Sequence, residues 1–219
     1  MKSRDGFENI KQQMIVEASI MINLKHPNIV EFMGSCISPP HLFLVTEYLS
    51  RGSLQSLIQD LDIVIEAEHI RKFALDTCQG MVYLQAFKII HRDLKTHNLL
   101  IAEDWTIKVC DFGLSRTMSD AGNTQTMTAC GTPSWAAPEV LNEQRYSSKA
   151  DVYSFGICLW EMCAREKPFV NMTTPQVILS VVTSGLRPDR NKVHPEFINI
   201  VDACWKTDPH DRPYFQSMM

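Results

Sequence analysis

The start of the chain carries a helical pattern of apolar residues. Between residues 7 and 24 these residues recur at the three- and four-residue spacing of one helix face, at Ile10, Met14, Met21 and Leu24. Glu17 stands where the next apolar residue of this stripe would be expected. The pattern therefore predicts a helix over residues 7–24 with a carboxylate on its buried face.

Two short strands are predicted next. The segments NIVEFMGSC (28–36) and HLFLVTEY (41–48) are rich in apolar and β-branched residues. The residues between them that favour a turn are Ser38, Pro39 and Pro40. We therefore expect the two strands to pair as a hairpin.

The rest of the chain is mostly helical in its patterning. Residues 51–61 and 66–87 read as helices, and TIKVC (106–110) reads as another short strand. The segment ADVYSFGICLWEMCA is apolar almost all round, which is typical of a buried central helix. Two further helices are expected around 174–183 and 195–205. The sequence thus predicts an α+β protein whose small strand-containing part ends near residues 50–52.

Composition narrows the classes of function. The 219 residues are 45% hydrophobic and 21% charged, with a net charge of −4 and no block of five like charges, so we expect neither nucleic acid nor a membrane as a partner. The scattered cysteines contain no C-x-x-C pair, so a disulfide framework or zinc site is not expected. No apolar run approaches the ~18 residues of a membrane span. We expect a soluble, cytoplasmic protein.

Polar residues interrupt the apolar pattern in the stretch HRDLKTHNLLI (91–101), where Asp93, Lys95 and Asn98 form the pattern D-x-K-x-x-N. Further along stand DFG at 111–113, APE at 137–139, DVYSFG at 151–156 and Arg212 in DPHDRP. Each motif alone is weak, since Asp-x-Gly is also ordinary turn chemistry. Their order and spacing together resemble the protein kinase family. GTPSWAAPE and TEYLSRGSL resemble the tyrosine-kinase-like group of serine/threonine kinases.

This resemblance implies a two-lobed, α+β protein kinase-like fold. Residues 1–49 would form a partial N-lobe of a regulatory helix and two strands, and residues 50–219 a mostly helical C-lobe with the catalytic and activation loops. The family covers ATP phosphates with a Gly-rich loop, but here no two glycines stand in G-x-G spacing. We therefore expect the chain to be a piece of a longer kinase domain, cut short at both ends.

The resemblance also implies roles for the polar residues. Phosphoryl transfer requires that a hydroxyl group be positioned and that charge on the phosphate oxygens be neutralised. Asp93 would accept or orient the proton of the substrate hydroxyl, and Lys95 would lie against the γ-phosphate of ATP. Asn98 and Asp111 would hold Mg²⁺, which prefers oxygen ligands.

Two neighbours of these residues allow two interpretations each. His91 is either a base or a buried structural residue stacked under Phe112, and we favour the structural role. Cys110 is either a reachable thiol or a buried residue at the end of a strand, and we favour the buried one.

For the nucleotide, the resemblance places Thr46 as the gatekeeper beside adenine. The backbone from Glu47 to Leu49 would hydrogen-bond the adenine ring, and Leu100 would pack beneath it. Glu17 would pair with a lysine that holds the phosphates. Lys2, fifteen residues earlier, is either that lysine, on a strand, or a solvated residue of the linker before the helix, which we favour.

Supporting contacts are also implied. Glu139 and Arg212 would form a buried ion pair. Asp151 would hold the backbone of the catalytic loop, or serve as a helix N-cap or first-turn acid, or do both. Thr132 together with Lys95 is typical of serine/threonine kinases in the family, whereas tyrosine kinases usually carry AAR where this chain has KTH. Serine and threonine are therefore the expected acceptors.

Arg92 suggests regulation by phosphorylation. A mobile loop is expected from residue 115 to Gly131, and its hydroxyl residues are Ser115, Thr117, Ser119, Thr124, Thr126 and Thr128. A phosphate on one of them, from an upstream kinase or from autophosphorylation, would pair with Arg92 and order the loop. The alternative is a loop that is merely solvated.

Two functions compete at this stage. The first is a serine/threonine kinase of intracellular signalling that transfers the γ-phosphate of ATP to protein hydroxyls. The second is a catalytically inactive, kinase-like scaffold, because the chain has no nucleotide clamp. A scaffold has no chemical need for Asp93, Asn98 and Asp111, and all three are present. This favours the enzyme, although the chain alone is expected to be weak or inactive.

Overall fold

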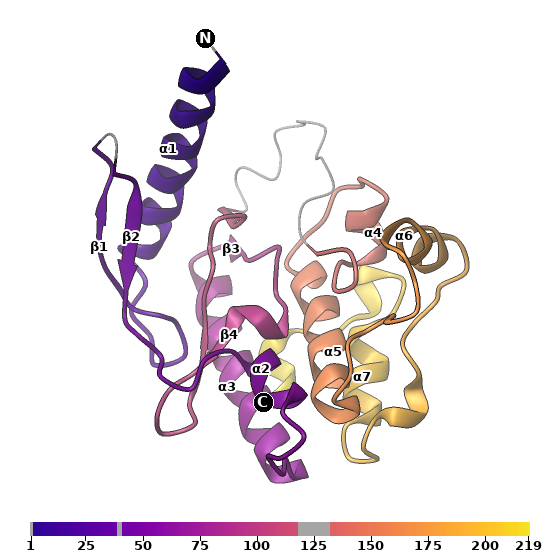
Figure 1. Cartoon of the computed structure of the whole chain (residues 1–219). Helices are drawn as coiled ribbons and strands as arrows, with labels where there is room; N and C mark the ends of the chain where they lie inside the picture. Colours follow the sequence, from indigo (N-terminus) through magenta and orange to yellow (C-terminus); the bar gives the residue numbers. More distant parts are fainter. Residues whose placement is uncertain (1, 39–40, 118–131) are drawn as a thin grey trace.

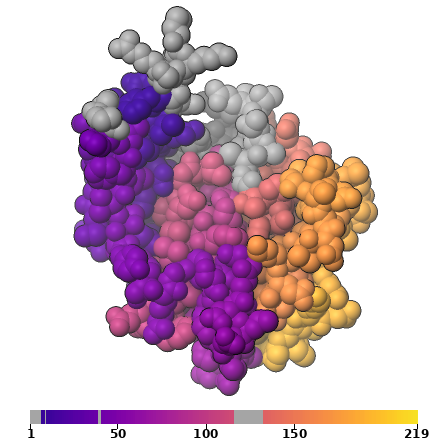
Figure 2. Space-filling view, viewed as in Figure 1, coloured from indigo at the N-terminus to yellow at the C-terminus, as the bar shows by residue number. Residues whose placement is uncertain are grey.

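The computed structural model describes residues 2–38, 41–117 and 132–219, apart from the side chains of residues 2–6, 9, 116 and 117. Within these ranges the fold is the predicted α+β arrangement (Figure 1). A long N-terminal helix and a strand hairpin lie at one side of the molecule, and a bundle of helices forms the other. The space-filling view shows the same division, with the indigo and purple N-terminal part flanking the orange and yellow helices across the magenta middle (Figure 2).

The N-terminal helix α1 (Lys2–Met21) begins earlier than predicted, although Gly6 disfavours a helix. Its apolar stripe is buried only toward its end. Met21 and Leu24 are buried, whereas Ile10 is 52% exposed. The first half of α1 therefore projects away from the body of the protein (Figure 1).

The predicted hairpin is confirmed. Strand β1 (Phe32–Cys36) pairs antiparallel with β2 (Phe43–Thr46), with Phe32 opposite Thr46 and Cys36 opposite Phe43. Of the turn residues proposed from the sequence, Pro39 and Pro40 lie outside the described residues. Helix α1 packs against both strands, and Glu17 on this helix is half-buried.

The larger part is built around α5 (Lys149–Ala164), which is buried along nearly its whole length, as its all-apolar pattern predicts. The predicted helices around it are α2 (Leu54–Gln59), α3 (Ala67–Ala86), α6 (Thr174–Thr183) and α7 (Ile198–Cys204), with the short α4 (Pro138–Leu141) beside α6. Short 3₁₀ turns lie at Thr96–Asn98, Arg190–Lys192, Pro209–Asp211 and Phe215–Met218. One hydrophobic cluster extends from Met21 to Phe215.

Two small sheets frame the stretch HRDLKTHNLLI. Strand β3 (Ile89–Ile90) pairs with β6 (Arg116–Thr117), and β4 (Leu99–Ile101) pairs with β5 (Ile107–Val109). Only β5 was predicted from the sequence. The polar residues 91–98 thus lie between two short buried strands, which makes them a fixed loop rather than a solvated one.

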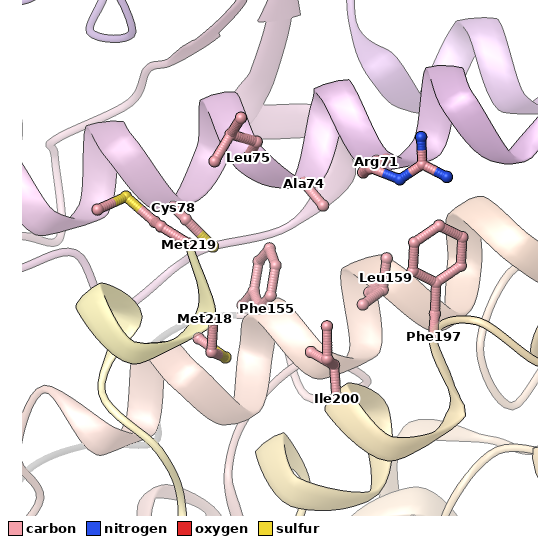
Figure 3. Close-up of a pocket in the computed structure, with 10 residues that line it drawn as sticks. All are labelled: Arg71, Ala74, Leu75, Cys78, Phe155, Leu159, Phe197, Ile200, Met218 and Met219. Atoms are coloured by element: carbon pink, nitrogen blue, oxygen red, sulfur yellow. The ribbon is translucent and has the colours of Figure 1, made fainter.

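An apolar pocket lies between α3, α5 and α7, beside the last 3₁₀ turn (Figure 3). Phe155 and Leu159 of α5 line it together with Phe197 and Ile200. Arg71 lies at this pocket and donates a hydrogen bond to Glu196 at 2.7 Å.

In the described ranges, none of the helices has the length and apolar character needed to cross a membrane.

Candidate active site

The loop after β3 is anchored from the central helix. Asp151, in the first turn of α5, accepts hydrogen bonds from the backbone N–H groups of His91 and Arg92, both at 2.9 Å. Arg92 has a φ of 72°, a left-handed conformation that is unfavourable for a residue other than glycine. Burial raises the pKa of Asp151, while the two N–H groups and the nearby His91 and Arg92 lower it. Asp151 therefore holds the loop backbone, and its first-turn position also suits the helix dipole.

His91 is completely buried and is used within the fold. Its Nε2 lies 3.0 Å from the Cys110 carbonyl, and its Nδ1 accepts a hydrogen bond from the Asp93 N–H at 3.3 Å. The edge of its ring packs against Phe112, with 5.6 Å between the ring centroids. Because both nitrogens face backbone groups, the geometry supports the structural role rather than that of a base.

Asp93 is the centre of a compact polar cluster. Lys95 Nζ donates to Asp93 Oδ2 at 2.6 Å and also to Thr132 Oγ1 at 2.8 Å. Thr132 donates to Asp93 Oδ1 from its backbone N–H at 3.0 Å and from its hydroxyl at 3.1 Å. The structure thus brings together three predicted site residues, of which Thr132 lies 39 positions along the chain from Asp93.

Asn98 faces both Asp93 and the DFG segment. Its Nδ2 donates to the Asp93 carbonyl at 2.9 Å, which leaves its Oδ1 as a possible ligand. The Cys110 N–H donates to the Asn98 carbonyl at 2.9 Å, so Asn98 lies beside the residue that precedes Asp111. Asp111 is exposed, and its Oδ1 accepts a hydrogen bond from the Gly113 N–H at 3.3 Å. The donor set of Asn98 and Asp111 consists of the hard oxygen atoms that Mg²⁺ prefers, and the two residues fit that ion.

Glu17 approaches the same segment from α1. A Cβ atom placed on Gly113 would lie 3.4 Å from both Glu17 Oε2 and Asp111 Oδ1, so the two carboxylates flank this glycine. Burial and the negative charge of Asp111 raise the pKa of Glu17, and a hydrogen bond from the Phe112 backbone opposes the shift. No cation of the described side chains forms a salt bridge with Glu17.

Both interpretations of Lys2 were wrong. Lys2 lies neither on a strand nor in a linker, because it is the first residue of α1, the helix that also carries Glu17. At 1.5 Å per residue, the two backbone positions are about 22 Å apart along the helix axis.

The segment predicted to hold adenine links the hairpin to the helical part. Thr46 ends β2, and Leu49 is buried. The Glu47 carboxylate accepts hydrogen bonds from Lys108 Nζ at 2.7 Å and from the Glu31 N–H at 2.8 Å, so this side chain fixes the segment. In the described part of the chain, the Glu47 carbonyl and the Leu49 N–H form no hydrogen bond. That these two groups bind adenine stays a prediction.

Leu100 is brought to this segment by β4. It forms an isolated antiparallel bridge with Ser53, and the Ile101 N–H donates to the Gly52 carbonyl at 2.9 Å. Leu100 is half-buried. Leu100 therefore lies beside Gly52 and Ser53, which follow the predicted adenine segment 47–49 along the chain.

The predicted pair of Glu139 and Arg212 is present and buried. Arg212 donates from Nη1 and Nη2 to the two carboxylate oxygens at 2.7 and 2.8 Å, a bidentate arrangement. Arg212 is 2% exposed. The pair connects α4, directly after the GTPSW segment, to the turn near the end of the described chain.

The predicted activation loop lies mostly outside the described residues. These residues do not include Ser119, Thr124, Thr126 or Thr128, and the side chain of Thr117 is not described either. Ser115 is completely buried, and its hydroxyl donates to the His91 carbonyl at 3.3 Å. Arg92 donates to the Leu114 carbonyl at 3.2 Å, and its guanidinium lies over the ring of Tyr146. Ser115 is therefore not accessible for phosphorylation in this conformation.

Cys110 lies directly after β5 and is half-buried, so it fits neither a fully buried nor a freely exposed thiol. Burial, with Asp111 and Glu17 nearby, raises the pKa of its thiol to about 12. A thiol with such a pKa holds its proton at neutral pH and is a poor nucleophile.

Sequence reasoning missed one set of contacts beneath the catalytic loop. Glu161 of α5 accepts hydrogen bonds from the Thr96 hydroxyl at 2.8 Å and from the Trp135 indole N–H at 3.0 Å. All three side chains are buried. A lone acid within the otherwise apolar run GICLWEMC was the signal that could have revealed this cluster.

Comparisons with known proteins agree with this geometry. A family model described as protein tyrosine and serine/threonine kinase matches residues 2–219. The probable serine/threonine-protein kinase drkB of Dictyostelium discoideum is 44% identical over 215 residues, which cover 97% of this chain and 31% of that protein. In Arabidopsis thaliana, the serine/threonine-protein kinase STY17 is 40% identical, covering 97% of this chain and 38% of that protein. The serine/threonine-protein kinase CTR1 is 41% identical, covering 94% and 26%. The chain thus spans about a third of the length of these relatives.

Proposed function

The chain belongs to the protein kinase family, within its tyrosine-kinase-like group, and we propose that it is the catalytic part of a serine/threonine kinase. In this proposal it transfers the γ-phosphate of ATP to serine and threonine hydroxyls of proteins in intracellular signalling. Residues 1–49 serve as part of the N-lobe and residues 50–219 as the C-lobe.

The observation that carries the proposal is the cluster around Asp93. Its carboxylate is held by Lys95 and Thr132, and its carbonyl is held by Asn98. A carboxylate fixed in this way can orient an acceptor hydroxyl and take up its proton, and such a contribution is typically worth about 10²- to 10⁴-fold in rate. Lys95 supplies the positive charge that a transferred phosphoryl group requires.

Mg²⁺ and ATP complete the site in this proposal. Asn98 and Asp111 hold the metal ion, which neutralises charge on the phosphate oxygens when it is bound. The carbonyl of Glu47 and the N–H of Leu49, which have no hydrogen-bond partner among the described residues, bond to adenine, with Thr46 at the gatekeeper position and Leu100 beneath the ring. Glu17, beside Gly113, accepts a lysine contact in the complete protein.

Serine and threonine are the proposed acceptors for two reasons. Thr132 and Lys95 are the two residues that the resemblance associates with this specificity, and they bond to each other and to Asp93. The relatives that match the chain are named serine/threonine kinases. A cytoplasmic location is proposed because the cysteines of the described residues are all free.

Regulation through Arg92 is also proposed. Its guanidinium lies at the start of the segment that leads into residues 118–131, bonded to the Leu114 carbonyl. Among the hydroxyl residues named from the sequence, the buried Ser115 is the least suitable acceptor, which leaves Thr117, Ser119, Thr124, Thr126 and Thr128. An upstream kinase or autophosphorylation would supply the phosphate.

The competing proposal is a non-catalytic, kinase-like scaffold. It is favoured by one observation: Glu17 lies beside Asp111 without a salt bridge to any cation of the described side chains. In that case Asp111 and Glu17 bind Mg²⁺, but among the described side chains no cation beside Glu17 holds the ATP phosphates. Nucleotide binding therefore separates the two proposals.

The test uses the natural full-length protein and measures binding and transfer separately. Asp93→Ala is expected to bind Mg²⁺-ATP with unchanged affinity in calorimetry and to lower kcat by about 10²- to 10⁴-fold, because Asp93 acts on the acceptor. Asp111→Ala is expected to weaken Mg²⁺-ATP binding as well. Asp62→Ala, at an exposed acid, is the control. A wild-type protein that binds no Mg²⁺-ATP, or an active Asp93→Ala variant, would contradict the proposal.

A further inference from the structure

Glu161 stands out among the buried groups that the proposed mechanism does not use. It lies in the fourth turn of α5, surrounded by apolar residues, with its side chain completely buried. One carboxylate oxygen, Oε2, accepts both the Thr96 hydroxyl at 2.8 Å and the Trp135 indole N–H at 3.0 Å. The other oxygen, Oε1, has no hydrogen-bond partner among the described residues. Burying such a group costs free energy, so its presence calls for a reason.

The two donors belong to the two segments that meet at Asp93. Thr96 is in the 3₁₀ turn that follows Lys95 in the catalytic loop. Trp135 closes a tight turn with Thr132, since the Trp135 N–H donates to the Thr132 carbonyl at 2.9 Å. The other end of this turn is bonded to Asp93 through Thr132. Glu161 and Asp93 therefore hold opposite ends of the segment 132–135.

We propose that Glu161 is a positioning residue for phosphate transfer: it fixes the turn 132–135 against the catalytic loop and thereby keeps Thr132 and Lys95 on Asp93. The inference rests on the proposed kinase function for its catalytic consequence. Its structural part, the coupling of Glu161 to the Thr132–Asp93 contact, does not depend on that function. Glu161 itself touches none of the proposed reacting atoms.

An apolar residue would fill the same space without the cost of burying a carboxyl, but it would leave the Thr96 hydroxyl and the Trp135 N–H unpaired inside the protein. A glutamine would keep an accepting oxygen for both donors. If Glu161 acts through its hydrogen bonds, an apolar substitution should impair the protein and glutamine should not. If Glu161 only fills space, the two substitutions should have similar effects.

The charge state of Glu161 gives a spectroscopic signature. Burial raises its pKa to about 7, against the opposing effects of Thr96, Trp135 and the positive charge of Lys167. The other groups that face this cluster are Cys158 on α5, whose thiol pKa is raised by burial and by Glu161 and Asp93, and His97, whose ring packs edge-on against Trp135 at 5.8 Å. The pKa of His97 is lowered by burial and by Lys95 and Lys167, so the histidine is mostly neutral at pH 7.

The kinetic experiment compares three variants of the natural full-length protein. Glu161→Ala is expected to lower kcat about tenfold or more while leaving the KM for ATP unchanged, because the catalytic residues are misplaced and the adenine contacts are not. Glu161→Gln is expected to stay within about threefold of wild type. Leu159→Ala is the control, since it removes a buried side chain of the same helix that lines the apolar pocket between α3, α5 and α7 (Figure 3). Equal kcat per folded molecule in Glu161→Ala and Leu159→Ala would overturn the proposal.

A second measurement needs no catalytic activity. Hydrogen exchange at the Thr132 N–H is expected to be faster in Glu161→Ala than in Leu159→Ala or wild type, because the turn is released at its other end. The indole N–H resonance of Trp135, assigned with Trp135→Phe, is expected to titrate near pH 7 in wild type and not in Glu161→Gln. If the wild-type protein transfers no phosphate, the kinase proposal fails. The exchange rate at Thr132 and the titration of the Trp135 resonance then still test whether Glu161 is coupled to the Thr132–Asp93 contact. An unchanged exchange rate at Thr132 would refute it.

Discussion

Buried acids in this protein are matched to donors of very different kinds. Glu139 faces the guanidinium of Arg212, which is buried with it and also donates to the carbonyls of Lys149, Lys206 and Thr207. Asp151 accepts hydrogen bonds from two backbone N–H groups, those of His91 and Arg92. The Glu139 carboxylate is stabilised by a positive charge, whereas the Asp151 carboxylate is stabilised by backbone dipoles. Removing the carboxylate therefore leaves a buried charge in the first case and unpaired N–H groups in the second.

Glu139→Ala is expected to destabilise the protein by about 3–5 kcal/mol, because it leaves a buried guanidinium without its counter-charge. The free energy of unfolding, measured by urea denaturation with tryptophan fluorescence, checks this. Asp202→Ala is the matched control, since it removes the carboxylate of a bidentate pair with Arg190 at an exposed position. Equal losses in the two variants would show that the Glu139 pair contributes no more than a surface contact.

At the scale of elements, the packing of α5 against α7 depends on a glycine. A Cβ atom on Gly156 would lie only 2.7 Å from Cys204 Cβ, a distance at which the two helices must separate. This contact explains why glycine stands in the middle of a long buried helix, where alanine has the higher helix propensity by ~1 kcal/mol.

Gly156→Ala is therefore expected to lower the free energy of unfolding by about 1–3 kcal/mol, because overpacking outweighs the gain in helix propensity. Gly34→Ala is the control, since a Cβ atom there would meet no atom within 4 Å. The comparison is made by thermal unfolding under identical conditions. A Gly156→Ala variant as stable as wild type would contradict the close approach of α5 and α7.

The elements that the sequence predicted well are the long helices, whose apolar pattern extends over many residues, and the hairpin. The amphipathic α3 and the all-apolar α5 were placed within a few residues, and the hairpin followed from its turn residues. The short strands β3, β4 and β6 were missed, because two or three apolar residues have no period and pair only through contacts far along the chain. The start of α1 was missed because Gly6 reads as a helix breaker.

At the scale of the whole molecule, the candidate site is assembled from distant segments of the chain. The types of its residues were predictable, because phosphoryl transfer needs a carboxylate, a cation and oxygen ligands in a fixed order. The contacts of Glu161 were not predictable, because they join Thr96, Trp135 and α5, and no local pattern encodes that meeting. The place of Lys2 was misread for the same reason, since spacing alone does not distinguish a strand from a helix.

The central claim is that Asp93 serves the transfer of phosphate from ATP to serine and threonine. The most direct measurement incubates the natural full-length protein with Mg²⁺-ATP and two peptide libraries, one with serine and threonine as the only acceptors and one with tyrosine. We expect Mg²⁺-dependent labelling of the serine/threonine library alone, lost in Asp93→Ala and kept in Asp62→Ala. Labelling of neither library, of tyrosine alone, or undiminished labelling by Asp93→Ala would contradict the account.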